Sequence, residues 1–139
     1  DYTCLRIGLI PSLLRMLSDN KHHPLPQQIF ELGIVTKNSF ENTYYLSGLK
    51  SSASANFTDC KSIVEAILRD SGISYDIKEF IHPAFVEGRC AELRSGNDKH
   101  LGYFGELHPK TISAFSLEHP VIAFEFQAEA LFDHIMNRN

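Results

Sequence analysis

The hydrophobic and polar positions of this chain separate it into helical and extended stretches. Residues 57–71 give the clearest helical pattern, with apolar side chains on one stripe, Thr58 as the expected cap and Gly72 as the expected end. Further helices are predicted over residues 11–19 and 109–115, and from Ala128 onward.

Extended stretches alternate with these helices. Residues 28–36 are rich in apolar and β-branched side chains, which predicts a central strand. The short polar stretch 37–41 joins it to a strand over residues 42–49, an order typical of an antiparallel hairpin. The loop 50–56 follows. Further strands are predicted over residues 75–81, 89–94, 100–106 and 121–127, with a tight turn at residues 95–98.

Short loops join most of these strands while the helices stand apart, which is typical of an α+β fold around an antiparallel sheet. No repeat or linker divides the chain, so a single domain over residues 1–139 is expected. At 139 residues the chain is large enough for one buried core, and its 43% hydrophobic and 22% charged residues are typical of a folded domain. No stretch approaches the ~20 apolar residues that cross a bilayer, so we expect no membrane partner.

Charge and cysteine content narrow the function. A formal net charge of −4 argues against the chain being the main electrostatic contact with nucleic acid, although Lys21 is a candidate for a weak contact with an RNA backbone. Cys4, Cys60 and Cys90 are odd in number, and no secretory signal precedes them. We therefore expect buried, reduced thiols and a cytoplasmic protein.

Two kinds of reactive site find little support in the sequence. A cysteine beside a histidine can act as a nucleophile, but none of the local sequences that accompany such cysteines is present. A small acyl-transfer enzyme therefore stays only as a third alternative. The pair His22-His23 is followed by Pro24, without a carboxylate or cysteine at zinc-binding intervals, so no metal site is expected.

A resemblance to a known family rests on segments that occur in one order along nearly the whole chain. The run Gly102-Tyr103-Phe104-Gly105-Glu106-Leu107-His108-Pro109, a short helix and the strand that opens 121–131 resemble the end of a class II aminoacyl-tRNA synthetase core. The sequence of these segments is most similar to that of the synthetase-like, non-catalytic module of the phenylalanyl-tRNA synthetase beta subunit. The match extends upstream through residues 5–14, 29–35 and 88–93.

The resemblance implies that one nucleotide-binding element has been lost. In a working class II enzyme, a motif-two Arg binds the ATP phosphate and the aminoacyl carboxylate, because its planar guanidinium makes bidentate contacts. The matching stretch here is residues 30–37, in which Gly33 and Val35 are kept. Lys37 keeps a positive charge but cannot make the two-pronged contact.

Motif three is altered more strongly. In a working class II enzyme, closely spaced glycines let the nucleotide lie against the strand, and an Arg on the following helix lies on the triphosphate. The matching stretch 123–130 has no glycine: Glu125 and Gln127 are among its residues, and Ala130 stands at the position of the Arg. A carboxylate at Glu125 would repel a triphosphate by roughly 4 kcal/mol per charge pair at an effective dielectric near 20.

A relic of the amino-acid pocket is the remaining candidate site. The corner formed by Gly105, Glu106 and His108 borders that pocket in the catalytic paralogue, so these three residues are the candidates for lining a vestigial cavity. The glycines themselves are expected to allow close packing of a strand, and His108-Pro109 to start a helix. Glu31 and Arg89 are candidates for a buried ion pair or hydrogen-bond cluster.

The resemblance implies a scaffold inside a larger ligase. Family beta subunits form a heterotetramer with a catalytic alpha subunit, which joins phenylalanine to tRNA(Phe) in protein biosynthesis using ATP and Mg²⁺. This segment would bind no cofactor and would serve assembly. The start at Asp1 and the end at Asn139 lead us to expect a fragment of an archaeal or eukaryotic beta subunit. The alternative is a stand-alone amino-acid sensor derived from a class II synthetase.

Overall fold

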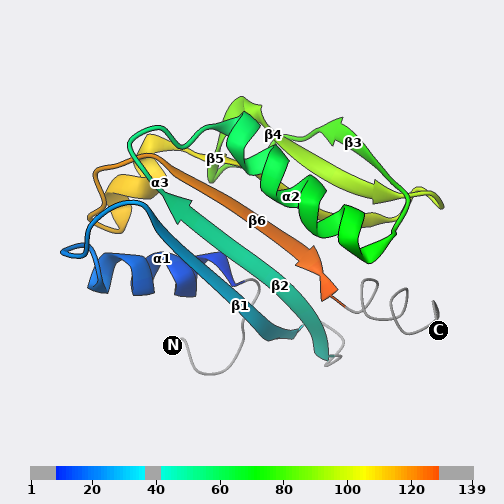
Figure 1. The fold of residues 1–139 in the computed structure, drawn as a ribbon, viewed down its shortest axis with the longest axis horizontal. Coiled ribbons are helices and arrows are strands. Elements are labelled where there is room, and N and C mark those ends of the chain that lie inside the picture. Colours follow the sequence, from blue (N-terminus) through cyan, green and yellow to red (C-terminus); the bar gives the residue numbers. More distant parts are fainter. Residues whose placement is uncertain (1–8, 37–41, 129–139) are drawn as a thin grey trace.

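The computed structural model describes residues 9–36 and 42–128 of the chain. They form a six-stranded antiparallel sheet with the strand order β1-β2-β6-β5-β4-β3. Figure 1 shows the helices α1 and α2 on either side of this sheet. The α+β architecture expected from the sequence is therefore confirmed. The strands are β1 (Gln27–Thr36), β2 (Asn42–Ser51), β3 (Tyr75–Glu79), β4 (Phe85–Ser95), β5 (His100–Leu107) and β6 (Val121–Gln127).

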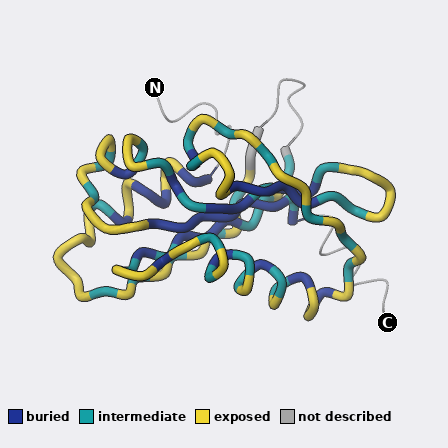
Figure 2. The backbone as a smooth tube through the Cα atoms, turned by 90° about the horizontal axis from the view of Figure 1, so that it is seen from above, coloured by how far each residue is buried: buried dark blue, intermediate teal, exposed yellow. Residues whose placement is uncertain are grey.

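The helices cover different parts of the sheet. One face carries α1 (Ile10–Asp19), which packs on β1, β2 and β6 and is called the α1 face below. The opposite, α2 face carries α2 (Phe57–Ser71), which packs on β5 and β6. The short α3 (Pro109–Ala114) links β5 to β6. Figure 2 shows the buried positions gathered in the sheet between the helices.

Local signals set the ends of the helices. Asn56 caps α2, because its side-chain oxygen accepts a hydrogen bond from the backbone N–H of Asp59 at 2.9 Å. The expectation that Thr58 is the cap was therefore wrong by two positions. Gly72 ends the helix as expected, with a φ of 77° that a residue with a side chain rarely adopts. His108 precedes α3, and its Nδ1 accepts a hydrogen bond from the backbone N–H of Lys110 at 3.0 Å.

The position of one strand differs from the prediction. Residues 28–36 were expected to form a central strand, but β1 lies at the edge of the sheet. The apolar run arises for another reason: Ile29 packs in the cluster that contains the buried residues of α1, while Phe30, Leu32 and Ile34 on the other face stay about half exposed. The hairpin with β2 is confirmed, although residues 37–41 lie outside the described residues, and β2 runs to Ser51 rather than Leu49.

The remaining strands follow the sequence with shifted ends. β3 ends at Glu79 rather than at residue 81, and β4 begins at Phe85 rather than at residue 89. An irregularity between Phe85 and Cys90 in the pairing with β5 contains Gly88, whose φ is 85°. The strand β6 has the bounds expected for it. The helix expected from Ala128 onward lies almost wholly outside the described residues.

Candidate functional site

Two of the residues matched to motif three, Glu125 and Gln127, lie on the α1 face of β6. Side chains alternate along a strand, so Ile122, Phe124 and Phe126 point into the core beneath α2. Ala123 packs in the other cluster, with the residues of α1. Glu125 and Gln127, two and four residues further along, share that α1 face.

Glu125 is buried in the centre of this face. Its side chain is only 3% exposed, and its Oε1 accepts a hydrogen bond of 2.6 Å from the backbone N–H of Leu9, the residue before α1. Its Oε2 accepts a hydrogen bond of 3.1 Å from the hydroxyl of Tyr103 on β5. The carboxylate therefore joins the start of α1 to the middle of the sheet, and it uses both oxygens inside the protein.

The partners of Glu125 fill the space around it. Leu9 is completely buried, and one of its methyl carbons would stand 2.9 Å from a side-chain carbon at Gly33 on β1. Gly33 thus allows Leu9 to close over the strand. Burial, reinforced by the nearby Glu125 carboxylate, raises the pKa of Tyr103, so that its hydroxyl keeps its proton and donates.

Polar residues extend from Glu125 in both directions across the sheet. The strand registers place Glu31, Ser47, Glu125, Tyr103 and Glu92 opposite one another on five neighbouring strands. The Ser47 hydroxyl is fully buried and donates to the Phe124 carbonyl at 2.9 Å. We call these five residues the polar row.

The polar row ends in an ion-paired cluster on β4 and β5. Glu92 is 8% exposed, accepts a hydrogen bond from Arg94 Nε at 3.1 Å, and lies 2.7 Å from Nδ1 of His100. Burial alone would raise the pKa of Glu92, but the hydrogen bonds from His100 and Arg94 lower it. Next to this cluster, the ring of His82 stacks on Tyr103 with centroids 5.0 Å apart, and burial lowers the pKa of His82.

A cavity of about 810 Å³ lies at a different place, beside α3. Its lining includes Glu106 and His108, two of the residues proposed for a relic pocket, together with Arg89, Ile112, His119 and Val121. Gly105, the third proposed residue, does not line it. A side-chain carbon at Gly105 would stand 2.3 Å from the Arg89 carbonyl oxygen, so this glycine serves the close approach of β4 and β5.

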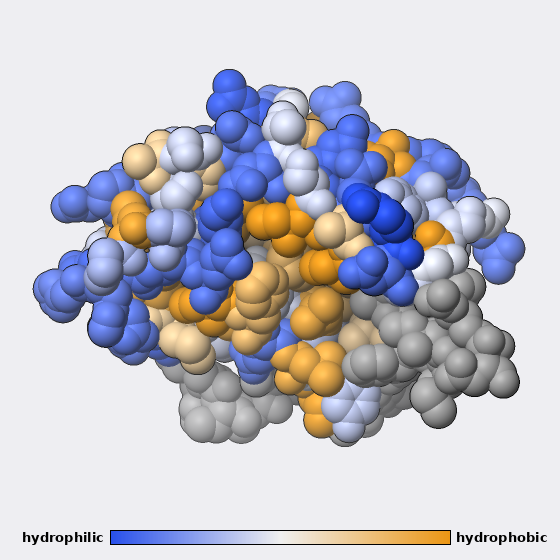
Figure 3. Space-filling view, in the orientation of Figure 1, coloured by the Kyte–Doolittle hydropathy of each residue, from blue (hydrophilic) through white to orange (hydrophobic). Residues whose placement is uncertain are grey.

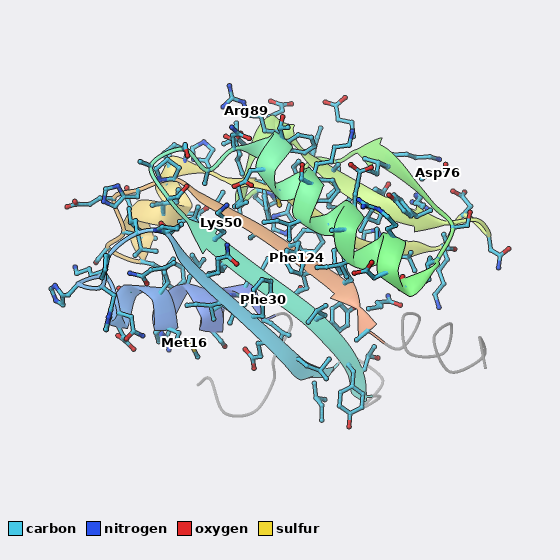
Figure 4. All side chains as sticks on the ribbon, in the orientation of Figure 1. Met16, Phe30, Lys50, Asp76, Arg89 and Phe124 are labelled. Atoms are coloured by element: carbon cyan, nitrogen blue, oxygen red, sulfur yellow. The ribbon has the colours of Figure 1, made fainter. Side chains whose placement is uncertain are left out.

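Glu106 has partners of its own in the wall of the cavity. It accepts a hydrogen bond of 2.7 Å from the backbone N–H of Phe57, the first residue of α2, and pairs with Arg89 at 3.0 Å. Arg89 was expected in a buried cluster, but its side chain is 61% exposed and lies at the margin of the molecule (Figure 4). Its side chain can stay exposed because the guanidinium reaches Glu106 from outside.

The cysteines and histidines form no reactive arrangement among the residues that the structure describes. Cys60 and Cys90 are free and buried as expected, and burial raises the pKa of each thiol to about 12. No group of three or more His, Cys, Asp or Glu side chains within the described ranges could hold a metal ion. Cys4, Lys37 and Ala130 lie outside those ranges.

The sequence matches one family along most of its length. The family described as "Phenylalanyl tRNA synthetase beta chain CLM domain" matches residues 1–128. The chain belongs to this family. None of the described helices is long and apolar enough to span a membrane.

Curated members of the family are similar over nearly the whole chain. The phenylalanine–tRNA ligase beta subunit of Archaeoglobus fulgidus is 41% identical over 133 residues, which are 96% of this chain and 24% of that subunit. The beta subunit of Methanopyrus kandleri is 38% identical over 138 residues, 94% of this chain and 23% of the relative. The chain thus spans about a quarter of the length of the curated beta subunits it matches.

Solved structures show where the family's fold recurs. A pyrrolysyl-tRNA synthetase of Desulfitobacterium hafniense superposes with a TM-score of 0.74 at 16% identity, covering 93% of this chain and 49% of that one. A second structure of that enzyme gives a TM-score of 0.73. At this identity the likeness shows the fold alone, and it agrees with the class II synthetase-like sheet expected from the sequence.

Within this family fold, sequence reasoning found some of the residues on the α1 face and missed others. Three of the predicted residues come together on that face: Gly33, Glu125 and Gln127. Tyr45 on β2 pairs with Gly33 on β1 and with Gln127 on β6. The partners Leu9 and Tyr103 were missed, because the packing of α1 on the sheet brings Leu9 to Glu125 and the pairing of β5 with β6 brings Tyr103. The pair Glu92–His100 was missed too, although the turn at residues 95–98 implied that these two strand ends lie side by side.

Proposed function

We propose that this chain is a non-catalytic structural module of a phenylalanine–tRNA ligase beta subunit. In this role it supports assembly with a catalytic alpha subunit, which charges tRNA(Phe) with phenylalanine using ATP and Mg²⁺ in the cytoplasm. The segment itself takes no part in the chemistry. Membership of the beta-chain family and the match to archaeal beta subunits support the setting.

The burial of Glu125 is the observation that carries the non-catalytic assignment. Motif three of a working class II enzyme needs backbone free of side chains at this strand, so that a nucleotide can lie against it. Here a carboxylate stands on that face, 3% exposed, with one oxygen on the Leu9 amide and the other on the Tyr103 hydroxyl. A nucleotide would have to displace both hydrogen bonds and face a negative charge. The residues present do not fit ATP.

The cavity beside α3 favours a second candidate, the amino-acid sensor. Its volume of about 810 Å³ is in the range of small-molecule sites, and its lining combines apolar residues such as Ile112 and Val121 with the charged side chains of Arg89 and Glu106. Against this function, Glu106 in the wall is already bound to Phe57 and Arg89, and His108 is bound to the start of α3. Both groups thus have structural tasks that account for them.

Calorimetry with phenylalanine and pyrophosphate exchange separate these functions. The structural module predicts no heat of binding for phenylalanine or histidine and no exchange by the chain alone, while the complex of complete beta with alpha exchanges pyrophosphate. Saturable phenylalanine binding that is weakened by Glu106→Gln would establish the sensor instead. Exchange by the isolated chain would overturn the non-catalytic assignment altogether.

A further inference from the structure

The two edges of the sheet differ in how well they are protected from pairing with another strand. The edge strand β3 has five residues, three of them charged: Asp76, Lys78 and Glu79. Short length and charge are the usual protection of a sheet edge. The opposite edge strand β1 has ten residues, no proline, no lysine and one charge, Glu31. Within the described residues no strand pairs with its outer side. β1 therefore has the properties of an edge that pairs.

An exposed apolar patch accompanies this open edge. Figure 3 shows hydrophobic side chains gathered on the α2 face beside α2, in the region of β1 and β2. Four of the large exposed hydrophobic residues lie there in register: Phe30, Leu32, Ile34 and Tyr44, with exposures of 52%, 52%, 41% and 45%. Phe30 joins this edge patch to the core, because its ring lies 5.9 Å from that of Phe124 (Figure 4). Apolar patches beside an open edge mark interaction surfaces.

The sequence of β1 is complementary to itself in one antiparallel register. If two copies of β1 pair about a two-fold axis perpendicular to the sheet, the α2 faces of both copies lie on the same side. Because directly opposed residues point to the same face, such an axis must set one residue opposite its own copy. Only the two registers in which residue 31 or residue 32 faces its own copy pair nine residues of the strand. The first would set Glu31 opposite its own copy, which is unfavourable. The second sets Glu31 opposite Gly33.

The register through Leu32 also joins the two apolar patches. Leu32 faces Leu32 of the second copy, and Phe30 faces Ile34, all on the α2 face. Directly opposed residues of antiparallel strands have Cβ atoms roughly 4.5–5.5 Å apart, so these half-exposed side chains would each gain an apolar neighbour. The outward backbone N–H and C=O groups of β1 would be paired in the same step.

We propose that β1 is a self-pairing edge through which two copies of this chain associate antiparallel about Leu32, forming one continuous twelve-stranded sheet. This self-association goes beyond the proposed function and does not depend on it. The occupant of the edge is a second copy of this chain, since the register about Leu32 pairs apolar residues with apolar residues and sets Glu31 opposite Gly33. An extended segment of another protein is the alternative occupant.

Cross-linking tests the register directly. A chain carrying Cys4→Ser and Leu32→Cys should form a disulfide-linked dimer under mild oxidation, because the two new thiols face each other across the axis. Cys60 and Cys90 are buried and do not compete. The matched control is Ile81→Cys in the same background, since Ile81 is 71% exposed but lies outside β1. Cross-linking of Leu32→Cys no faster than that of Ile81→Cys would overturn the proposal.

Sedimentation velocity tests the association without a cross-link. The unmodified chain should pass from monomer to dimer as its concentration rises. Leu32→Lys should stay monomeric, because it sets two ammonium groups opposite each other, whereas Met16→Lys should dimerise as before. Met16 is 47% exposed on α1, on the other side of the sheet (Figure 4). Circular dichroism checks that both variants fold. A chain that is monomeric throughout, or a Leu32→Lys variant that still dimerises, would contradict the self-pairing edge.

Discussion

The two faces of the sheet differ in whether their unusual residues have partners inside the protein. On the α1 face the unusual residues are polar, and the structure satisfies them internally: Glu125 is held by Leu9 and Tyr103, and Glu92 by Arg94 and His100. On the α2 face of β1 and β2 the unusual residues are apolar and about half exposed. Polar groups that are hydrogen-bonded inside the protein would lose those bonds on binding a ligand, whereas an uncovered apolar face gains from a protein partner. The surroundings of Glu125 on the α1 face are therefore filled by side chains, whereas the apolar patch of β1 and β2 on the α2 face is open to a partner.

The sharpest contrast between the faces is that between two leucines on paired strands. Leu49 is 2% exposed beneath α1, whereas Leu32 is 52% exposed on the α2 face. We expect Leu49→Ala to lower the free energy of unfolding by about 3 kcal/mol, through lost burial and a cavity. Leu32→Ala should cost under about 1 kcal/mol in the monomer. Urea denaturation at low concentration measures both, and equal losses would contradict the contrast.

The second prediction concerns the carboxylate on the α1 face. Glu125→Ala leaves the buried Leu9 amide and Tyr103 hydroxyl without these acceptors, so the free energy of unfolding should fall by about 2–3 kcal/mol. Glu118→Ala, at an exposed position, is the control and should be nearly neutral. If Glu125→Ala unfolds at the same urea concentration as the control, the carboxylate does not hold α1 to the sheet.

The third prediction concerns activity and changes the segment matched to motif three of working class II enzymes. Ala130→Arg alone should not restore adenylate formation, because Glu125 and Gln127 still occupy the strand where the nucleotide would lie. Adding Glu125→Gly tests whether the carboxylate is the main obstacle. Pyrophosphate exchange is the assay, and a gain in rate from Ala130→Arg by itself would refute the prediction.

The smallest expected effect is a pH dependence at the end of the polar row. The pKa of Glu92 is lowered in the folded protein, so ionised Glu92 stabilises the fold above the pKa of an unfolded Glu, and this contribution is lost as the pH falls through the lowered value. The stability difference between the unmodified chain and Glu92→Gln should therefore shrink in acid. Thermal melts at neutral and acidic pH measure it, and a difference that grows as the pH falls would have the wrong sign.

The contrast between local and long-range information explains which features the sequence predicted. The bounds of α2 were predicted correctly because Gly72 and the apolar stripe lie within the helix or next to it. The apolar run of β1 was recognised as a strand, but its place at the edge depends on β6 pairing with β2, which no local pattern records. Partners that are set by strand register, such as Tyr103 for Glu125, likewise could not be predicted from the local sequence.

The central claim is that side chains occupy the face on which relatives with the full motif would place a nucleotide. The most direct measurement is a titration of the isotopically labelled chain with ATP and Mg²⁺, followed by nuclear magnetic resonance at the backbone amide of Leu9 and the ring of Tyr103. Our account predicts that these signals do not move, because both groups stay bound to Glu125. Saturable shifts at both positions would show a nucleotide on the α1 face and contradict it.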